Sequence, residues 1–412
     1  MRRCPFSRLL SAALLTAVLL SSMSSVSCAD ATVEEASALR LFIATDTHYI
    51  APALTDHGSY FRQMVENADG KYMLQCEELT DAFVRQVIRE KPDALILSGD
   101  LSFNGALESH LAFAEKLCQI REAGVPVFVI PGNHDLNYPM AAAFHGDSFT
   151  LVASVTPEEF SEIYNDFGYR DAIARDGSSL SYVTELSEEF LLLMVDVNTP
   201  SAPGSLTEET LQWAREQLEY AQNTGRKVIA VSHQTLLEHA FLSPGIVMYG
   251  WERLLSLYEE YGVVCNLCGH MHVQHIKLSD SGFPDIAGSA LITWPNQFGV
   301  LELDRGEARY ATERVDTSSF AGFDAAALRF LQETNRRQVA AELRSLLVED
   351  PGNELRDYLV LVNAAYVAGR GDTLDWNSPF YECWQSVPSL YAYYLRTIRE
   401  DGRNHTVLSF SY

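Results

Sequence analysis

The sequence is poor in positive charge. Its 412 residues include 30 lysines and arginines against 55 aspartates and glutamates, which gives a formal net charge of −25. A surface this acidic repels DNA, RNA and anionic lipid, so no nucleic acid polymer is expected as a partner. Any anionic ligand has to be attracted by a local source of positive charge that outweighs the average field of the protein.

Cysteine is also scarce. Two of the seven cysteines, Cys4 and Cys28, lie near the N-terminus, which leaves an odd number for the rest of the chain. A chain of this length can bury a core without cross-links, so no disulfide framework is predicted. Cys265 and Cys268 have the C-x-x-C spacing of a redox or zinc site, but they lie in an apolar run and no second such pair exists, which favours a buried strand.

An apolar run near the N-terminus predicts export. Residues 9–20 are shorter than the roughly 20 residues that span a bilayer, but they suit a signal peptide. Two processing sites remain open: an Ala-x-Ala pattern at residues 29–31 and a lipobox-like pattern that ends at Cys28. The expected location is outside the cell or on the outer face of a bacterial cell membrane, with lipidated Cys28 as the anchor in the second case. Three basic residues precede the run: Arg2, Arg3 and Arg8.

Short apolar runs that alternate with helical stretches predict an α/β core. The runs are continuous, as in strands buried on both faces, and the stretches between them carry helical periodicity. After residue 275 the pattern changes to short strands with turns, which predicts a second, largely antiparallel sheet, and then to a mostly helical tail. The predicted strands are 39–44, 94–97, 125–130, 190–195, 227–231 and 263–267, then 276–278, 286–291, 299–303 and 308–315; the helices are 78–90, 109–123, 207–223, 325–347 and 355–368.

Polar side chains follow five of the first six predicted strands. Open α/β sheets build their sites at the carboxyl ends of strands, so these side chains are expected to lie together. Aspartate, asparagine and neutral histidine together bind divalent ions such as Mn, Fe or Zn, and two ions can share a bridging carboxylate. Such a pair of ions would also supply the missing positive charge. The residues are Asp46 and His48; Asp100; Asn133, His134 and Asp135; His233; and His270 and His272.

These blocks, in this order, resemble the calcineurin-like metallophosphoesterase superfamily. The blocks are Asp-x-His, Gly-Asp, Gly-Asn-His-Asp, a single histidine and Gly-His-x-His, between residues 39 and about 303. The amino-acid sequences of segments 44–49 and 165–169, together with the helical tail, are similar to those of the secreted class III cyclic-nucleotide phosphodiesterases of Gram-positive bacteria. The resemblance implies a sandwich of two mixed sheets flanked by helices, at residues 36–316, with a small helical domain at 317–412 and a signal peptide at 1–28.

The resemblance also implies a role for each residue of the blocks. Asp100 would bridge two divalent transition-metal ions. His134 would be the general acid at the leaving group, oriented by Asp135. Gln234 departs from the His-His pair of many cyclic-nucleotide members. The remaining ligands would be Asp46, His48 and His272 on one ion, and Asn133, His233 and His270 on the other.

The expected activity is hydrolysis of a small-molecule phosphodiester, such as a cyclic nucleotide or a related nucleotide diester. A metal-bridging hydroxide would attack phosphorus in line, and His134 would protonate the departing alkoxide. No P-loop or Gly-x-Ser-x-Gly motif points to a covalent route. The same metal core would serve a phosphomonoesterase acting on nucleotides or proteins, and a surface binding protein without activity would keep the fold but lose ligands.

Overall fold

Two β-sheets form the centre of the protein. The computed structural model describes residues 38–239 and 245–412. The predicted signal peptide and Cys28 lie outside the described residues. In the first sheet the strand order is β15 (Val407–Ser411), β14 (Glu307–Arg314), β13 (Gln297–Asp304), β1 (Leu39–Ala44), β2 (Ala94–Leu97) and β3 (Val127–Val129).

The second sheet contains the other long apolar runs. Its order is β11 (His275–Leu278), β12 (Pro284–Ala287), β10 (Asn266–Cys268), β9 (Lys227–Ser232), β8 (Phe190–Val195), β7 (Tyr182–Glu185) and β6 (Ala174–Arg175). A separate hairpin is made by β4 (Ala142–His145) and β5 (Ser148–Leu151). Both large sheets are mixed: β1 is parallel to β2 and antiparallel to β13, and β8 is parallel to β9 and antiparallel to β7.

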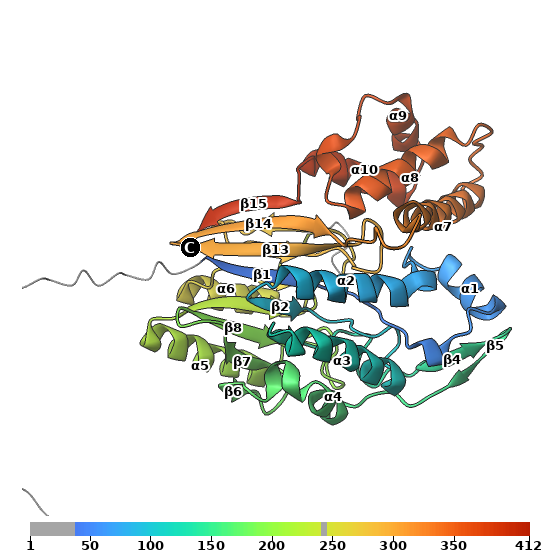
Figure 1. Cartoon of the computed structure of the whole chain (residues 1–412). Coiled ribbons are helices and arrows are strands. Elements are labelled where there is room, and N and C mark those ends of the chain that lie inside the picture. The colour runs from blue at the N-terminus through green and yellow to red at the C-terminus, as the bar shows by residue number, and fades with distance from the viewer. Residues whose placement is uncertain (1–37, 240–244) are drawn as a thin grey trace, which may run out of the picture. The chain divides into compact units, whose positions relative to one another are not determined.

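Alternate residues of the central strands pack on opposite faces. Leu192 of β8 belongs to the core between the sheets, whereas its neighbour Leu193 packs with Trp213 of α5 on the outer face. Burial on both faces explains why these strands are apolar without alternation. Helices therefore cover the outer faces, and the predicted sandwich is confirmed (Figure 1). The helices of the sandwich are α1 (Ser59–Glu66), α2 (Cys76–Glu90), α3 (Leu107–Glu122), α4 (Pro157–Ile163), α5 (Glu208–Thr224) and α6 (Trp251–Tyr261).

The strands after residue 275 do not form a sheet of their own, so that prediction was wrong. β12 pairs with β10 in the second sheet, whereas β13 pairs with β1 in the first. The local sequence predicts each strand but carries no signal for the distant strand that it pairs with. Cys265 and Cys268 are buried and free, as expected for a strand.

The C-terminal region is mainly helical, as predicted. Its helices are α7 (Phe323–Ser345), α8 (Glu354–Val367), α9 (Pro379–Gln385) and α10 (Leu390–Asp401) (Figure 1). They share a small core around the fully buried Trp384. β15 then returns to the first sheet, which the prediction of a helical tail missed. Residues 38–412 form one compact unit. In the described part of the chain, no helix is long and apolar enough to cross a membrane.

Candidate metal centre

The carboxyl ends of five strands bring the predicted site residues together. Asp46 and His48 follow β1, Asp100 follows β2, and His233 follows β9. Asn133 and His134 follow β3, and His270 and His272 follow β10. Because β1, β2 and β3 are mutually parallel, as are β9 and β10, the loops that leave each set of strands lie at one edge of its sheet. The predicted residues form two adjoining groups there, which share Asp100.

The backbone of the predicted ligands adopts an uncommon conformation. Five of the seven have a positive φ, which is rare for residues other than glycine and is retained where the surroundings enforce it. The glycines beside them allow close approach: a Cβ at Gly132 would lie 2.2 Å from Asp100 Oδ1, and one at Gly269 would lie 1.8 Å from Thr45 Oγ1. The positive φ angles are 51° at Asp46, 41° at His48, 50° at Asp100, 68° at His270 and 57° at His272.

The first group contains Asp46, His48, Asp100 and His272. The Nε2 atoms of His48 and His272 are 3.2 Å apart. Asp46 Oδ1 lies 3.2 Å from His272 Nε2 and 3.7 Å from His48 Nε2. The other oxygen of Asp46 accepts hydrogen bonds from the Thr45 hydroxyl and the His270 backbone N–H, so Oδ1 is the oxygen directed at the histidines.

The second group joins Asp100, Asn133, His233 and His270. His233 Nε2 lies 3.4 Å from Asp100 Oδ1 and 3.1 Å from Asn133 Oδ1, and His270 Nδ1 lies 3.3 Å from His233 Nε2. The two oxygens of Asp100 face different groups, because Oδ2 lies 3.7 Å from His48 Nε2. This is the arrangement that a bridging carboxylate requires.

Hydrogen bonds orient the histidine rings. His233 Nδ1 donates to the Ser98 carbonyl at 2.8 Å, and His270 Nε2 donates to the Gly245 carbonyl at 2.7 Å. His272 Nδ1 lies 3.4 Å from a carboxylate oxygen of Asp69. Since a carbonyl oxygen only accepts, these nitrogens carry hydrogens, and the second nitrogen of His233 and of His270 is the one directed at the site. Asp69 belongs to no sequence motif, so its place beside His272 was not predicted.

The donor set fits two divalent ions. Lone pairs of imidazole nitrogens and carboxylate oxygens converge, which is unfavourable without a cation between them. Asp46 Oδ1 is buried and has no hydrogen-bond partner among residues 38–239 and 245–412. Burial lowers the pKa of both His233 and His272. Asp100 and Asp46 outweigh burial at His233, and Asp46 and Asp69 outweigh it at His272, so both pKa values rise to about 9 in the metal-free chain. Protons therefore occupy places that metal ions would take, and Mn, Fe or Zn suits these ligands.

His134 lies beside the ligands and outside both groups. Its Nδ1 donates to the Phe103 carbonyl at 3.1 Å, so Nε2 is the nitrogen left for chemistry. The ring stacks on Tyr138 with centroids 5.1 Å apart and meets the ring of His48 edge-on at 5.0 Å. The backbone N–H of His134 donates to Asp100 Oδ1 at 2.8 Å, which ties the loop of His134 to the shared carboxylate.

Asp135 does not orient His134, in contrast to the expectation. Its carboxylate is fully buried and accepts hydrogen bonds from the backbone N–H groups of Leu101, Ser102 and Gly132. The Phe103 carbonyl takes the predicted orienting role. Asp135 therefore fastens the loop after β2 to the loop after β3, and it has no access to a substrate.

Gln234 points away from the ligands. Its amide exchanges two hydrogen bonds with the amide of Asn198, at 2.9 and 2.7 Å. Both side chains are buried, with exposed fractions of 3% and 5%. Gln234, the residue that departs from the family's His-His pair, therefore has a structural role in this amide pair, and its amide is not free to bind a substrate.

A third histidine cluster lies outside the site, among histidines that fit no sequence motif. His275 and His405 stack with centroids 3.8 Å apart, and each has Nε2 within hydrogen-bonding distance of Asp401 Oδ2. His405 Nδ1 accepts the Ile276 backbone N–H, so its Nε2 carries the hydrogen and has no lone pair for a metal. The cluster therefore fastens the end of α10 to β11.

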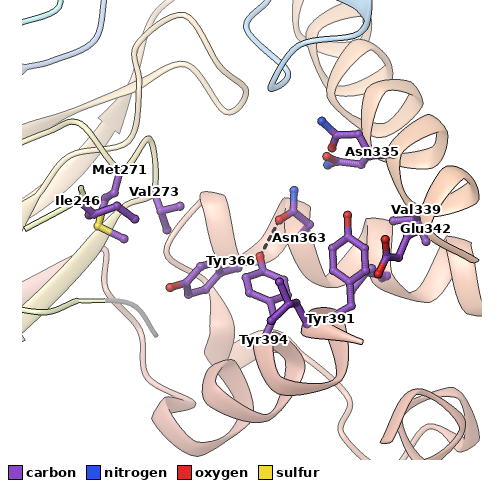
Figure 2. Close-up of a pocket in the computed structure, with 13 residues that line it drawn as sticks. Ile246, Met271, Val273, Asn335, Val339, Glu342, Asn363, Tyr366, Tyr391 and Tyr394 are labelled. Atoms are coloured by element: carbon purple, nitrogen blue, oxygen red, sulfur yellow. Dashed lines mark hydrogen bonds between the residues drawn. The ribbon is translucent and has the colours of Figure 1, made fainter. Parts of the chain in front are cut away.

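Two hollows are lined by residues that neighbour the ligands in the chain. One of about 500 Å³ contains His134 and Tyr138, with aromatic residues of α1 and the β4–β5 hairpin. The other, of about 470 Å³, contains Met271, which lies between His270 and His272 in the chain, and residues of α7, α8 and α10 (Figure 2). Gln338 of α7 lines both hollows.

Known proteins with related sequences are named as phosphodiesterases. A probable glycerophosphodiester phosphodiesterase of Arcobacter nitrofigilis is 29% identical over 193 residues, which are 45% of this chain and 58% of the relative. A probable cyclic nucleotide phosphodiesterase of a Pseudoalteromonas species is 36% identical over 101 residues, 24% of this chain and 33% of the relative. The chain thus matches less than two thirds of the length of these relatives.

A dimetal phosphatase from Danio rerio is a structural neighbour with 16% identity and a TM-score of 0.49, over 67% of this chain and 96% of that one.

The sequence also matches a family model. Residues 39–274, more than half of the chain, match the model of the calcineurin-like phosphoesterases. This range contains every residue of the two ligand groups. The chain therefore belongs to the calcineurin-like phosphoesterase family.

Proposed function

We propose that this protein is a dinuclear-metal phosphodiesterase that acts on nucleotide diesters, cyclic ones included. The observation that carries the proposal is the pair of hollows beside the ligand groups. An acyclic phosphodiester has two organic substituents on phosphorus, and each hollow has room for one. A phosphomonoester has a single substituent and would leave one hollow without a role.

The residues divide the chemistry between them. Two bound divalent ions would supply Lewis-acid stabilisation of the phosphoryl oxygens and an activated hydroxide. Asp100, which belongs to both ligand groups, would bind both ions. His134, held through Nδ1 by the Phe103 carbonyl, presents Nε2 to its hollow, where a proton on this atom reaches a departing alkoxide. The substituent that leaves therefore lies in the hollow of His134, and the retained substituent lies in the hollow of Met271.

The nucleotide part of the proposal draws on the relatives. One is named as a probable cyclic nucleotide phosphodiesterase, others as glycerophosphodiester phosphodiesterases. The resemblance of residues 44–49 and 165–169 to secreted class III cyclic-nucleotide phosphodiesterases points the same way. Mn²⁺ is the first metal to test, because carboxylate and imidazole ligands both suit it.

The test compares diesters with a monoester under one metal condition. Bis(4-nitrophenyl) phosphate, 4-nitrophenyl phosphate, and 2′,3′- and 3′,5′-cyclic AMP are incubated with the Mn²⁺-loaded protein, and kcat/KM is measured for each. A higher kcat/KM for the diester than for the monoester, with turnover of at least one cyclic nucleotide, supports the proposal. Preference for the monoester without turnover of either cyclic nucleotide would identify a phosphomonoesterase instead.

Export is proposed separately, from the sequence of residues 1–31. Three arginines before an apolar run and two readable processing sites support it. Expression in a bacterial host followed by mass spectrometry of the mature N-terminus tests this proposal. A diacylglycerol-modified Cys28 identifies an anchored lipoprotein, a start after residue 31 identifies a free secreted protein, and an intact leader on a cytoplasmic protein would contradict export.

A further inference from the structure

The hollow beside Met271 is built mainly by the C-terminal helices. Tyr366 and Asn363 come from α8, and Tyr391 and Tyr394 come from α10. Figure 2 shows these side chains along one wall of the cavity, with Asn335 of α7 across from them and Met271 at the far end from α7. Residues of the helical region and Met271 of the ligand loop therefore line one cavity.

Three tyrosines give this cavity an aromatic wall. Tyr366 and Tyr394 meet edge-to-face, with ring centroids 5.5 Å apart at 86°. Tyr391 packs against the buried Trp384 at 5.7 Å. The Tyr394 hydroxyl donates to Asn363 Oδ1 at 2.6 Å, which leaves the Asn363 amide hydrogens for another acceptor. Rings held in this way present fixed apolar surfaces on which a planar group can pack.

One polar group in the cavity has no partner. Asn335 is 8% exposed, and its Nδ2 makes no hydrogen bond with the described part of the chain. A buried amide donor without an acceptor costs about 1–3 kcal/mol, so its presence calls for an explanation. The terminal torsion of asparagine is broad, so the amide can turn toward a ligand without strain. The ligand at this position has to supply an acceptor.

The charged residues of the lining restrict the chemical class of the ligand further. The residues that line the cavity, all in the described part of the chain, include one carboxylate, Glu342, and no lysine or arginine. A second phosphate is therefore excluded as the occupant. A quaternary ammonium group would suit the aromatic wall but offers no acceptor to Asn335. A planar heterocycle that carries acceptors and an N–H donor satisfies Asn335, Glu342 and the tyrosines together.

We propose that this cavity binds the nucleobase of the retained substituent, so that the C-terminal helices determine the preference for nucleotide diesters. The inference rests on the proposed phosphodiesterase function and adds a specificity site to it. The base packs on the tyrosine wall, the Asn335 amide donates to a ring or carbonyl acceptor, and Glu342 accepts from an N–H group. The phosphate then lies at the ligands that flank Met271.

Two substrates with the same leaving group test the proposal. Thymidine 5′-(4-nitrophenyl phosphate) retains a nucleoside, whereas methyl 4-nitrophenyl phosphate retains a methyl group, and both release nitrophenolate. We expect Asn335→Leu in the Mn²⁺-loaded protein to lower kcat/KM about 10-fold for the thymidine substrate, since one hydrogen bond to the base is lost. The methyl substrate should change less than twofold. Asn223→Leu, an exposed position on α5, is the matched control and should change neither.

A second pair of variants separates packing from hydrogen bonding. Tyr391→Leu should lower kcat/KM for the thymidine substrate about 10-fold, because stacking of a base is lost, and Tyr391→Phe should restore it. Calorimetry with thymidine 5′-phosphate should show the same order of affinities. Asn335→Leu should also melt no lower than the parent, since the donor that it removes has no partner in the described part of the chain.

The possible outcomes distinguish a failure of the nucleobase site from a failure of the proposed phosphodiesterase function. Turnover of neither substrate by the parent protein would contradict the phosphodiesterase proposal itself. Turnover of both, with Asn335→Leu and Tyr391→Leu affecting them equally or not at all, would overturn only the nucleobase site. Variants that lose turnover of glycerophosphocholine but keep that of the thymidine substrate would assign the cavity to a cationic headgroup and overturn it as well.

Discussion

At the scale of single residues, Asp100 matters because its two oxygens face different ligand groups. Replacing it by alanine removes a ligand from both ions, whereas Asp46→Ala removes a ligand from one. We expect Asp100→Ala to lose most of both ions and to lose hydrolysis, and Asp46→Ala to retain close to one ion. Elemental analysis after gel filtration measures the metal content. Two ions retained by Asp100→Ala would show that the carboxylate is not a bridge.

His134 is expected to act in proton transfer and not in metal binding. His134→Ala keeps the backbone N–H that Asp100 accepts, so the metal content should stay near that of the parent. Turnover should fall roughly 10²–10⁴-fold for an alkoxide leaving group and less for nitrophenolate, which needs little protonation. Equal losses on both kinds of leaving group would assign His134 another role.

Asp135 gives the matched contrast to His134. Asp135→Ala leaves three buried backbone N–H groups without their acceptor, so we expect a loss of at least about 3 kcal/mol in the free energy of unfolding. The dependence of turnover on the leaving group should not change, because Phe103 holds the His134 ring. Urea unfolding and the leaving-group series measure the two effects. A flattened leaving-group dependence in Asp135→Ala would return a catalytic role to this residue.

At the scale of the elements, the C-terminal helices are held by the cluster of His275, Asp401 and His405. Burial raises the pKa of Asp401, but the hydrogen bonds from both histidines outweigh burial and hold the pKa well below its usual range. A carboxyl with a lowered pKa in the folded state stabilises it above the pKa of the unfolded state and loses that contribution as the pH falls. We therefore expect the helical region to loosen below about pH 4, where unfolded aspartate protonates.

Hydrogen exchange measures this loosening element by element. Amides of α10 and β15 should lose protection on going from pH 6 to pH 3.5 before those of β8 and β9, after correction for the intrinsic rates. Asp401→Asn should lack this early loss, because it removes the titrating carboxylate. Simultaneous loss of protection in α10 and β8 of the parent would show that the cluster does not control the helical region separately.

Some of these elements could be predicted from the sequence, whereas others could not. The strands that precede Asp46, Asp100 and His233 are predictable, because apolar runs and the polar residues after them are local signals. The contacts of Asp69 and of the Phe103 carbonyl are not, since one residue lies in a loop without a motif and the other acts through its backbone. β15 was missed for a related reason: Leu408 alternates with exposed neighbours, and its partner Tyr310 is far away in the sequence.

At the scale of the whole molecule, the repulsion among the many carboxylates is relieved at the ligand groups by protons or by metal ions. The chain carries a formal charge of −25, and its ligand groups add Asp46 and Asp100 at close quarters. In the metal-free chain, protons on His233 and His272 offset this repulsion, as their pKa values of about 9 indicate. Histidines with raised pKa values stabilise the fold fully below the unfolded pKa of about 6.5 and lose that contribution as the pH rises through 9.

Bound ions would replace those protons, so the two forms of the protein should respond differently to pH. We expect removal of metal by a chelator to lower the unfolding temperature by roughly 5–10 °C at pH 7, from about 2.7 kcal/mol for each ion at a hundredfold excess over its Kd. The difference should widen between pH 6.5 and 9, because only the metal-free form loses its stabilising protons there. Calorimetry of the loaded and chelated protein across this range measures it, and His272→Asn should narrow the difference. A gap that stays constant or shrinks with rising pH would mean that these histidines do not exchange protons for metal.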